Sequence, residues 1–263
     1  MNLLSVDEVS VIYPGQAQPA LSEVSLSVTG QDLVVALGPS GCGKSTLLNV
    51  LAGFRVPDQG RVTFDGRAVD GPGVERAVVF QHDALLPWLD VRENVGFGLK
   101  LQGVGRAERE ATVAATLTLV GLGQAGNRRC HELSGGMRQR VGIARAIASR
   151  SRVLLMDEPF GALDAFTREQ MQALLLTVWH ESRRGIFLIT HDIEEALFLA
   201  TELLLMSPAP GRIVERVRPG FCQRYLAGED VRAIKSDPAF IELRESLLRH
   251  VFSQGQHHSR EAA

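Results

Sequence analysis

The chain has few cysteines, no excess of one charge and no long hydrophobic run, and each absence excludes a class of protein. Its three cysteines, Cys42, Cys130 and Cys222, are scattered and odd in number. They fit neither a disulfide framework nor a metal-ligand spacing, and they favour a reducing cytoplasm. No stretch of about 18 apolar residues occurs, and the first residues contain no basic region. We therefore expect a chain that is neither secreted nor membrane-spanning, with any membrane role supplied by a partner.

The two signs of charge nearly cancel. The 28 Lys and Arg residues stand against 30 Asp and Glu residues, for a net charge of -2. A protein whose main partner is nucleic acid is expected to carry a broad positive field, so the composition argues against nucleic-acid binding. With 263 residues and 45% hydrophobic content, the chain is long enough to bury a substantial core.

The hydrophobic patterns predict a fold of class α/β. Residues 4–11 and 24–28 alternate apolar and polar positions, which is typical of half-buried strands. Short continuous apolar runs at 33–37, 153–156, 186–189 and 203–206 are typical of buried parallel strands. Between about 83 and 149 the strand signal disappears and a helix is predicted over 106–120. We expect an α/β core with an antiparallel β portion on its N-terminal side and an inserted helical subdomain at about 83–149.

The segment after the apolar run 33–37 predicts a phosphate-binding loop. It follows the pattern GxxxxGK[ST], in which glycines let backbone N–H groups turn inward and the next helix points its positive end at the anion. Lys44 is predicted to reach the β and γ phosphates of a nucleotide, and Ser45 to ligate Mg²⁺. The predicted nucleotide-binding residues are Gly38, Pro39, Ser40, Gly41, Cys42, Gly43, Lys44, Ser45 and Thr46.

Two carboxylates end the apolar run 153–156. Asp157 and Glu158 come where side chains reach the ligand crevice of a parallel sheet. Asp157 is predicted to hold Mg²⁺, directly or through water, as the partner of Ser45. Glu158 is predicted to polarise the water that attacks the γ-phosphate. The alternative is an Asp-Glu-Pro run that only ends a strand and caps a helix.

A second anion site is predicted at Ser134, Gly135 and Gly136. Ser134 is placed as the N-cap of a helical stretch, and the two glycines leave backbone N–H groups open. Taken alone, this is a capped helix start. Because one nucleotide needs only one such site, the second site suggests a role toward another molecule's nucleotide.

These motifs resemble those of the ATP-binding subunits of ABC transporters. Leu133 to Gly136 is similar to the family's signature, and the likeness extends in the family's order to Tyr13, Gln81, the run from Gly161 to Asp164, and His191. The resemblance implies a P-loop NTPase fold with a RecA-like core, an antiparallel β subdomain and an inserted helical subdomain. We expect the ATPase domain at 4–240 and a C-terminal helix with a frayed tail at 241–263, because the residues from Ser253 onward are polar and aperiodic.

The resemblance also implies roles for single residues. Tyr13 would stack on adenine, and His191 would contact the γ-phosphate and link it to Glu158. Gln81 would sense Mg²⁺ and the attacking water. The implied cofactors are ATP and Mg²⁺. The implied catalytic residues are Lys44, Gln81, Glu158 and His191, and the implied metal residues are Ser45, Gln81 and Asp157.

In the family two subunits pack head to tail. Ser134 to Gly136 of one copy would therefore complete the ATP site of the other, and Asp164 would lie at the subunit interface. Met137 stands where the family usually has Gln. Phosphate contact is expected to survive this change, because the backbone N–H groups and the Ser134 hydroxyl do not depend on the side chain at 137. Whether ribose or interface contacts at this corner also survive is left open by the sequence.

The remaining expectations concern partners. The apolar segment from Leu85 to Val95, with Trp88, follows Gln81 in the region where the family receives the cytoplasmic helices of its membrane subunits; packing of the helical subdomain is the alternative. Five further segments resemble the ATP-binding subunits of importers of taurine, alkanesulfonates and nitrate, with taurine favoured: 71–76, 160–176, 193–205, 210–216 and 234–238. The implied partners are a second copy, transmembrane permease subunits and, through these, a periplasmic substrate-binding protein. The implied location is the cytoplasmic face of the inner membrane. No nucleic-acid partner is expected.

Two other classes share the ATP motifs. An ABC-type ATPase of DNA repair would carry long coiled-coil or zinc-binding insertions, and this sequence has neither. An ABC ATPase that works on ribosomes would normally carry two cassettes, whereas each motif occurs here once.

Overall fold

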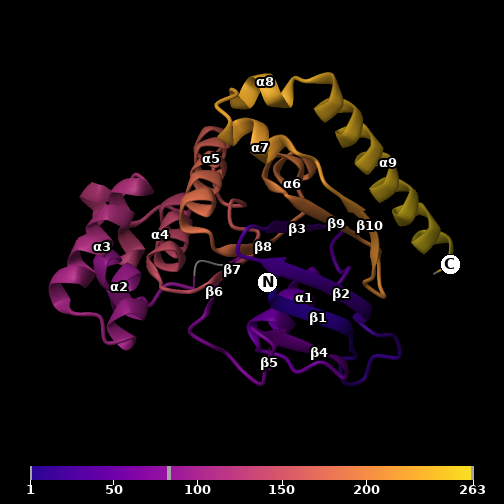
Figure 1. Ribbon diagram of the computed structural model, residues 1–263, viewed down its shortest axis with the longest axis horizontal. Coiled ribbons are helices and arrows are strands. Elements are labelled where there is room, and N and C mark those ends of the chain that lie inside the picture. Colours follow the sequence, from indigo (N-terminus) through magenta and orange to yellow (C-terminus); the bar gives the residue numbers. More distant parts are fainter. Residues whose placement is uncertain (1, 82–83, 262–263) are drawn as a thin grey trace.

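A six-stranded sheet forms the centre of the fold in the computed structural model, which describes residues 2–81 and 84–261, with side chains up to residue 250. The strand order is β10-β9-β3-β8-β7-β6 (Figure 1). Neighbours are parallel except for the antiparallel pair β9 and β10. The strands are β3 (Leu33–Leu37), β6 (Arg76–Val79), β7 (Val153–Asp157), β8 (Gly185–Thr190), β9 (Glu202–Met206) and β10 (Ile213–Val217).

A second, antiparallel sheet covers one face of the first. Its order is β2-β1-β4-β5, with β1 (Asn2–Val11), β2 (Leu21–Thr29), β4 (Gln59–Phe64) and β5 (Arg67–Ala68). Figure 1 shows these strands below the parallel sheet, with α1 (Lys44–Ala52) beside them. Apolar residues alternate along β1 and β2 because only one face of this sheet is buried.

Apart from α1, the helices of the described residues fall into two groups. Between β6 and β7 lie α2 (Val91–Leu101), α3 (Arg106–Leu119) and α4 (Gly135–Ala148), at the left of Figure 1. The remaining helices cover the other face of the sheet and its upper edge. They are α5 (Ala165–Ser182), α6 (Ile193–Leu199), α7 (Phe221–Leu226), α8 (Val231–Lys235) and α9 (Pro238–Glu261).

Two hydrophobic cores lie on the two faces of the parallel sheet. In β3, Leu33 and Val35 pack on the side of α4 to α6, whereas Val34 and Ala36 pack toward the antiparallel sheet and α1. Both sets are buried, which explains why the strand is a continuous apolar run rather than an alternating one.

The predicted α/β class is confirmed, and the apolar runs predicted as parallel strands are the strands β3, β7, β8 and β9. The short strand β6 and the edge strand β10 were not anticipated. The prediction that the tail from Ser253 is irregular differs from the structure, in which α9 continues to Glu261; Ala262 and Ala263 lie outside the described residues.

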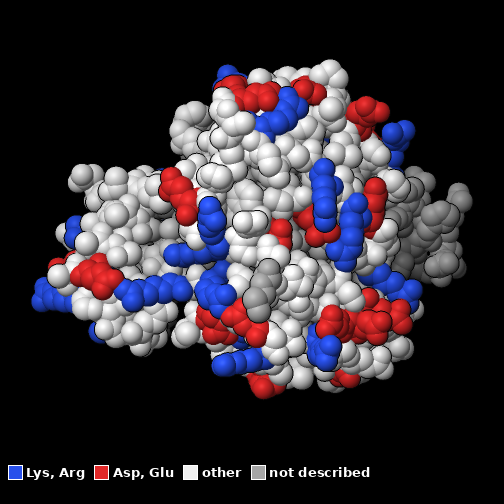
Figure 2. Space-filling model, viewed as in Figure 1, with Lys and Arg blue, Asp and Glu red and all other residues white. Residues whose placement is uncertain are grey.

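Charged side chains of both signs are interspersed on the face shown in Figure 2, without a large area of one sign. Within the described residues, no helix combines the length and the apolar character needed to cross a bilayer.

Candidate nucleotide-binding and catalytic site

The loop between β3 and α1 is shaped by glycines with positive φ. Gly43 is the N-cap of α1 with φ 88°, and a Cβ at this position would lie 2.6 Å from the carbonyl oxygen of Ala20. Gly41 has φ 80° and open space around its Cα. Because Gly43 brings no side chain to cap the helix, the first N–H groups of α1 remain available to an anion. This local geometry is that of a phosphate cradle.

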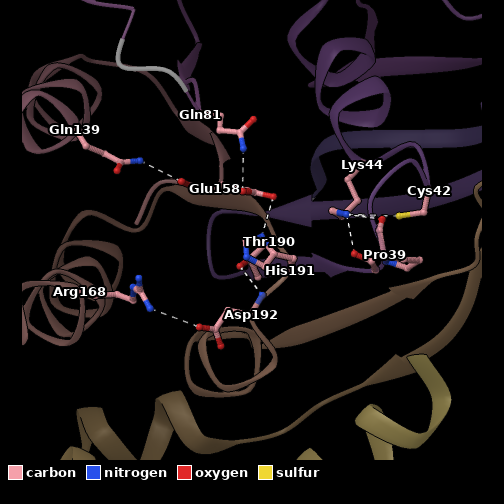
Figure 3. A network of polar contacts seen from close by, with 11 residues as sticks. Pro39, Cys42, Lys44, Gln81, Gln139, Glu158, Arg168, Thr190, His191 and Asp192 are labelled. Atoms are coloured by element: carbon pink, nitrogen blue, oxygen red, sulfur yellow. Dashed lines mark hydrogen bonds and ion pairs between the residues drawn. The ribbon is translucent and has the colours of Figure 1, made fainter. Parts of the chain in front are cut away.

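Lys44 lies buried within this loop. Its Nζ donates hydrogen bonds to the carbonyl oxygens of Gly38 at 2.7 Å and Pro39 at 2.9 Å, and it lies 3.7 Å from the Sγ of Cys42 (Figure 3). Burial raises the pKa of the Cys42 thiol, although the nearby Lys44 ammonium lowers it. The Lys44 ammonium therefore lies beside a neutral thiol. The carbonyl groups of Gly38 and Pro39 stabilise its positive charge.

Tyr13 lies against the start of α1. Its hydroxyl is 3.2 Å from the Oγ1 of Thr46, and the Arg55 guanidinium covers one face of its ring at 5.2 Å from the ring centroid. Arg55 is itself fixed by hydrogen bonds to the carbonyl of Ile12 and the carboxylate of Asp58. The ring is thus held in place on one face by a cation.

Glu158 is held between two side chains from neighbouring strand ends. Its Oε2 accepts a hydrogen bond from the Nε2 of Gln81 at 3.0 Å, and its Oε1 lies 3.0 Å from the Nδ1 of His191 (Figure 3). Gln81 follows β6, Glu158 follows β7 and His191 follows β8. The three residues meet because the carboxyl ends of parallel strands share one edge of the sheet.

The backbone of Glu158 is unusual. Its φ is 44°, in the left-handed region that non-glycine residues rarely occupy. Such a residue stores roughly 1–3 kcal/mol and persists only where its surroundings fix it. Its N–H donates to the carbonyl of Ile189 at 3.0 Å, and its carbonyl accepts from Gly161 N–H at 3.2 Å.

A cavity of about 720 Å³ brings most of the predicted site together. One wall is the phosphate loop and α1, and the opposite wall includes Gln81 and Glu158. Predicted residues on its lining are Tyr13, Ser40, Gly41, Gly43, Lys44, Ser45, Thr46, Gln81 and Glu158, joined by the unpredicted segment 16–20 and Ala209. Gly38, Pro39 and Cys42 lie within the loop itself, and Asp157 ends β7 directly before Glu158.

Ser134 to Gly136 lie elsewhere, at the N-terminus of α4. Ser134 is the N-cap, its Oγ accepting from the N–H of Met137 at 3.3 Å, as its position in the sequence predicts. Ser134 and Gly135 are exposed. Asp164, exposed as well, caps α5 through the N–H of Thr167 at 3.0 Å. Among the described residues, the large cavity and the α4 N-terminus are thus separate features of one chain.

Two buried polar residues beside the site were missed by sequence reasoning. Gln139 lies in α4 and contacts the turn that contains Glu158. Glu195 lies in α6 and lines a cavity of about 70 Å³ together with Glu158 and His191. The sequence contains one sign that Gln139 is buried: it is a polar residue on the apolar face of a helix, four residues before the buried Ile143.

The donors present fit a magnesium-bound nucleoside triphosphate. The space around Gly41 is open, as a phosphate requires. The Ser45 hydroxyl, the Gln81 amide and the Asp157 carboxylate supply oxygen ligands of the kind Mg²⁺ accepts. In the described part of the chain, no group of three or more His, Cys, Asp or Glu side chains could hold a metal alone. Mg²⁺ commonly shares its coordination between a few protein oxygens and substrate phosphates. This geometry defines a P-loop nucleotide-binding protein.

Comparisons with known proteins narrow this class. The family described as "ABC transporter" matches residues 21–161. The Taurine import ATP-binding protein TauB of Chromobacterium violaceum is 66% identical, over 97% of this chain and 97% of that protein. The proteins of the same name from Pseudomonas entomophila and Pseudomonas putida KT2440 are each 61% identical over 97% of this chain. A solved dimeric structure of the ATP-binding cassette MJ0796 bound to ADP and Pi is 29% identical, with a TM-score of 0.73 over 82% of this chain and 98% of that one.

The chain belongs to the ABC transporter family. It is an ABC-type ATPase, as the resemblance of its motifs predicted, and the P-loop fold of its family is confirmed by the structural neighbours.

Proposed function

We propose that this chain is the ATP-hydrolysing subunit of an importer that takes up taurine across the cytoplasmic membrane. The main support for ATP hydrolysis is the position of the Glu158 carboxylate. Gln81 and His191 hold it on the wall of the cavity opposite the phosphate loop. Relatives that are 60–66% identical over 97% of this chain carry the name of a taurine import ATP-binding protein, which supports the choice of cargo.

The residues divide the work of hydrolysis. Bound ATP supplies the phosphoanhydride bond that is cleaved. The N–H groups of the loop and the Lys44 ammonium hold its phosphates, and Lys44 exchanges its carbonyl contacts for phosphate oxygens as it does so. The Glu158 carboxylate, oriented by the Gln81 N–H, takes a proton from the attacking water. His191 lies beside Glu158 with its side chain 66% exposed, and it would contact the γ-phosphate.

Mg²⁺ would be held by Ser45, Gln81 and Asp157. The Ser45 hydroxyl is exposed at the start of α1, and Asp157 ends the neighbouring strand β7. Adenine would stack on the face of Tyr13 that Arg55 does not cover.

A second copy would complete the site. Ser134 and Gly135 are exposed at a capped helix N-terminus, which is suited to binding an anion. The cavity of the same copy does not include these residues. Two solved structures of the similar cassette MJ0796 are dimeric. Head-to-tail packing would place this signature segment on the ATP of the partner copy, so closure of the dimer would depend on bound ATP.

An apolar surface beside Gln81 would receive the permease. Trp88 is 69% exposed, and the exposed rings of Phe54 and Phe80 stack with centroids 5.9 Å apart. Phe80 directly precedes Gln81, so the Phe54–Phe80 pair is joined to the catalytic wall. Through the permease the chain would lie on the cytoplasmic face of the inner membrane and would respond to a periplasmic substrate-binding protein.

The catalytic assignment is tested with Glu158→Gln. The amide keeps the size of the side chain but cannot accept the proton, so turnover should fall by about 10²–10⁴-fold. The variant should still bind ATP and should accumulate as an ATP-bound dimer in size-exclusion chromatography. Glu181→Gln, at an exposed position of α5, is the matched control and should hydrolyse ATP normally. Full hydrolysis by Glu158→Gln would remove Glu158 from the catalytic role.

The cargo is tested by reconstitution. The subunit is combined in liposomes with its permease and binding protein, and ATP-dependent uptake of taurine is measured against alkanesulfonates and nitrate. Preferred uptake of taurine is expected. Preferred uptake of an alkanesulfonate or nitrate would replace taurine as the cargo and leave the ATPase assignment intact.

A further inference from the structure

We propose that Gln139 is a positioning residue that holds the turn carrying Glu158 in its reactive conformation. This inference rests on the proposed role of Glu158 as the base that activates water. Gln139 lies in α4 and is only 3% exposed. It does not line the large cavity described above, so it would act through Glu158 and not through the nucleotide.

Both ends of the Gln139 amide bond the same turn. Its Nε2 donates to the carbonyl oxygen of Glu158 at 3.1 Å, and its Oε1 accepts from the N–H of Ala162 at 2.8 Å. Figure 3 shows the amide reaching from its helix toward Glu158. A glutamine satisfies one donor and one acceptor at this spacing, so the side chain matches the turn at two points.

The turn from Glu158 to Ala162 contains a strained backbone, which only contacts with neighbouring residues can stabilise. Glu158 has φ 44°, and Pro159, which follows it, brings further steric restriction and no N–H group. The bonds from the Gln139 amide and the Gly161 N–H converge on the Glu158 carbonyl and fix the direction of that peptide. If the peptide rotated, the backbone angles of Glu158 would have to readjust, which would redirect the carboxylate away from Gln81 and His191.

The support comes from a helix that is docked closely on the turn. A Cβ placed on Gly136 would lie 3.3 Å from the Cδ2 of Leu163 and 3.5 Å from the carbonyl oxygen of Ala162. Gln139 is therefore one turn along from a tight contact between α4 and the same loop. An apolar side chain would fill the space of Gln139, but it would leave the Ala162 N–H without this acceptor.

Two substitutions of Gln139 distinguish positioning of the Glu158 turn through hydrogen bonds from simple filling of space. Gln139→Met keeps the length of the side chain and removes both hydrogen bonds. Gln139→Glu keeps the acceptor for Ala162 N–H but sets an oxygen against the Glu158 carbonyl oxygen. We expect kcat for ATP to fall at least about tenfold in both variants, since small misplacements of a reacting group carry losses up to about 10²-fold. The Kd for ADP should stay within about twofold of the parent.

Ile143→Val is the matched control. Ile143 is buried on the same face of α4, one turn beyond Gln139, and its substitution loosens packing without touching the Glu158 turn. It should lower the unfolding temperature while kcat stays within about twofold of the parent. A similar loss of kcat in Ile143→Val would mean that general loosening of α4 is responsible, and it would overturn the inference.

The same measurements in the Glu158→Gln background complete the test. If Gln139 acts through Glu158, adding Gln139→Met should not lower the residual turnover further, and the ATP-bound dimer should still form. A further tenfold loss, or parent-like kcat in Gln139→Glu, would overturn the inference. Hydrolysis retained by Glu158→Gln alone would instead overturn the proposed function on which it rests.

Discussion

Glu195 lies buried behind the loop that carries His191. Its Oε2 accepts from the Nε2 of Gln172 at 3.0 Å, and its own N–H donates to the Asp192 carboxylate at 3.1 Å. Burial raises the pKa of the Glu195 carboxyl from 4.5 to about 7, against the hydrogen bonds from Thr190 and Gln172, which lower it. The carboxyl therefore changes its charge near neutral pH.

The raised pKa of Glu195 predicts that the stability of the fold depends on pH. Because the pKa is higher in the folded state, the folded protein binds the proton more tightly, and stability falls as pH rises from about 4.5 to about 7. Glu195→Gln removes this dependence. Relative to the parent, the variant should gain roughly 2–3 kcal/mol of unfolding free energy between about pH 4.5 and 7. Urea unfolding at several pH values measures the difference, and a constant difference between parent and variant would contradict the prediction.

The sequence predicts the site residues that belong to local motifs better than those that meet through folding. Lys44, Ser45 and Glu158 stand at fixed positions after apolar strands, and all three line the same cavity. Gln139 contacts residues 19 and 23 positions away, and that pairing depends on how α4 docks on the sheet. Such a contact has no local signature beyond a polar residue on an apolar helix face.

At the scale of elements, the N-terminus of α4 combines a cap with a proposed nucleotide contact. The Ser134 Oγ accepts the N–H of Met137, and the same end of the helix carries the partial positive charge that favours an anion. A substitution that keeps the cap and adds a negative charge separates the two roles.

Ser134→Asp makes that separation. Aspartate is a good N-cap, so the unfolding free energy should stay within about 0.5 kcal/mol of the parent, whereas Ser134→Ala should lose about 1 kcal/mol. The aspartate charge would oppose the phosphates of the partner's ATP, so ATP-dependent dimers should be lost in size-exclusion chromatography. Ser134→Asn is the control that caps without charge. Dimers that form normally with Ser134→Asp would argue against phosphate at this helix end.

The elements that were not anticipated are those with weak or mixed patterns. β6 is four residues long and begins with the buried Arg76, and β10 alternates half-exposed and exposed residues at the sheet edge. Neither forms the long apolar run that marks β3 or β8, because an edge strand has one neighbour and less burial. Their pairing is decided by the sheet and not by the local sequence.

At the scale of the whole molecule, the proposed permease contact includes Trp88, which lies between β6 and the helical group. We expect Trp88→Ala to keep the ATPase activity of the isolated subunit and to uncouple it from taurine uptake in the reconstituted importer. Leu101→Ala, at a position of α2 that is 72% exposed, is the control. Unchanged coupling in Trp88→Ala would place the permease contact elsewhere.

The two tryptophans of the chain occupy opposite environments: Trp88 is 69% exposed and Trp179 is 7% exposed. Their intrinsic fluorescence therefore has two separable components. A soluble quencher such as acrylamide reaches Trp88 far more readily than Trp179, and docking of a partner over Trp88 would shield it, while unfolding would expose Trp179. The native chain thus contains, without any added label, one optical reporter of assembly and one of folding.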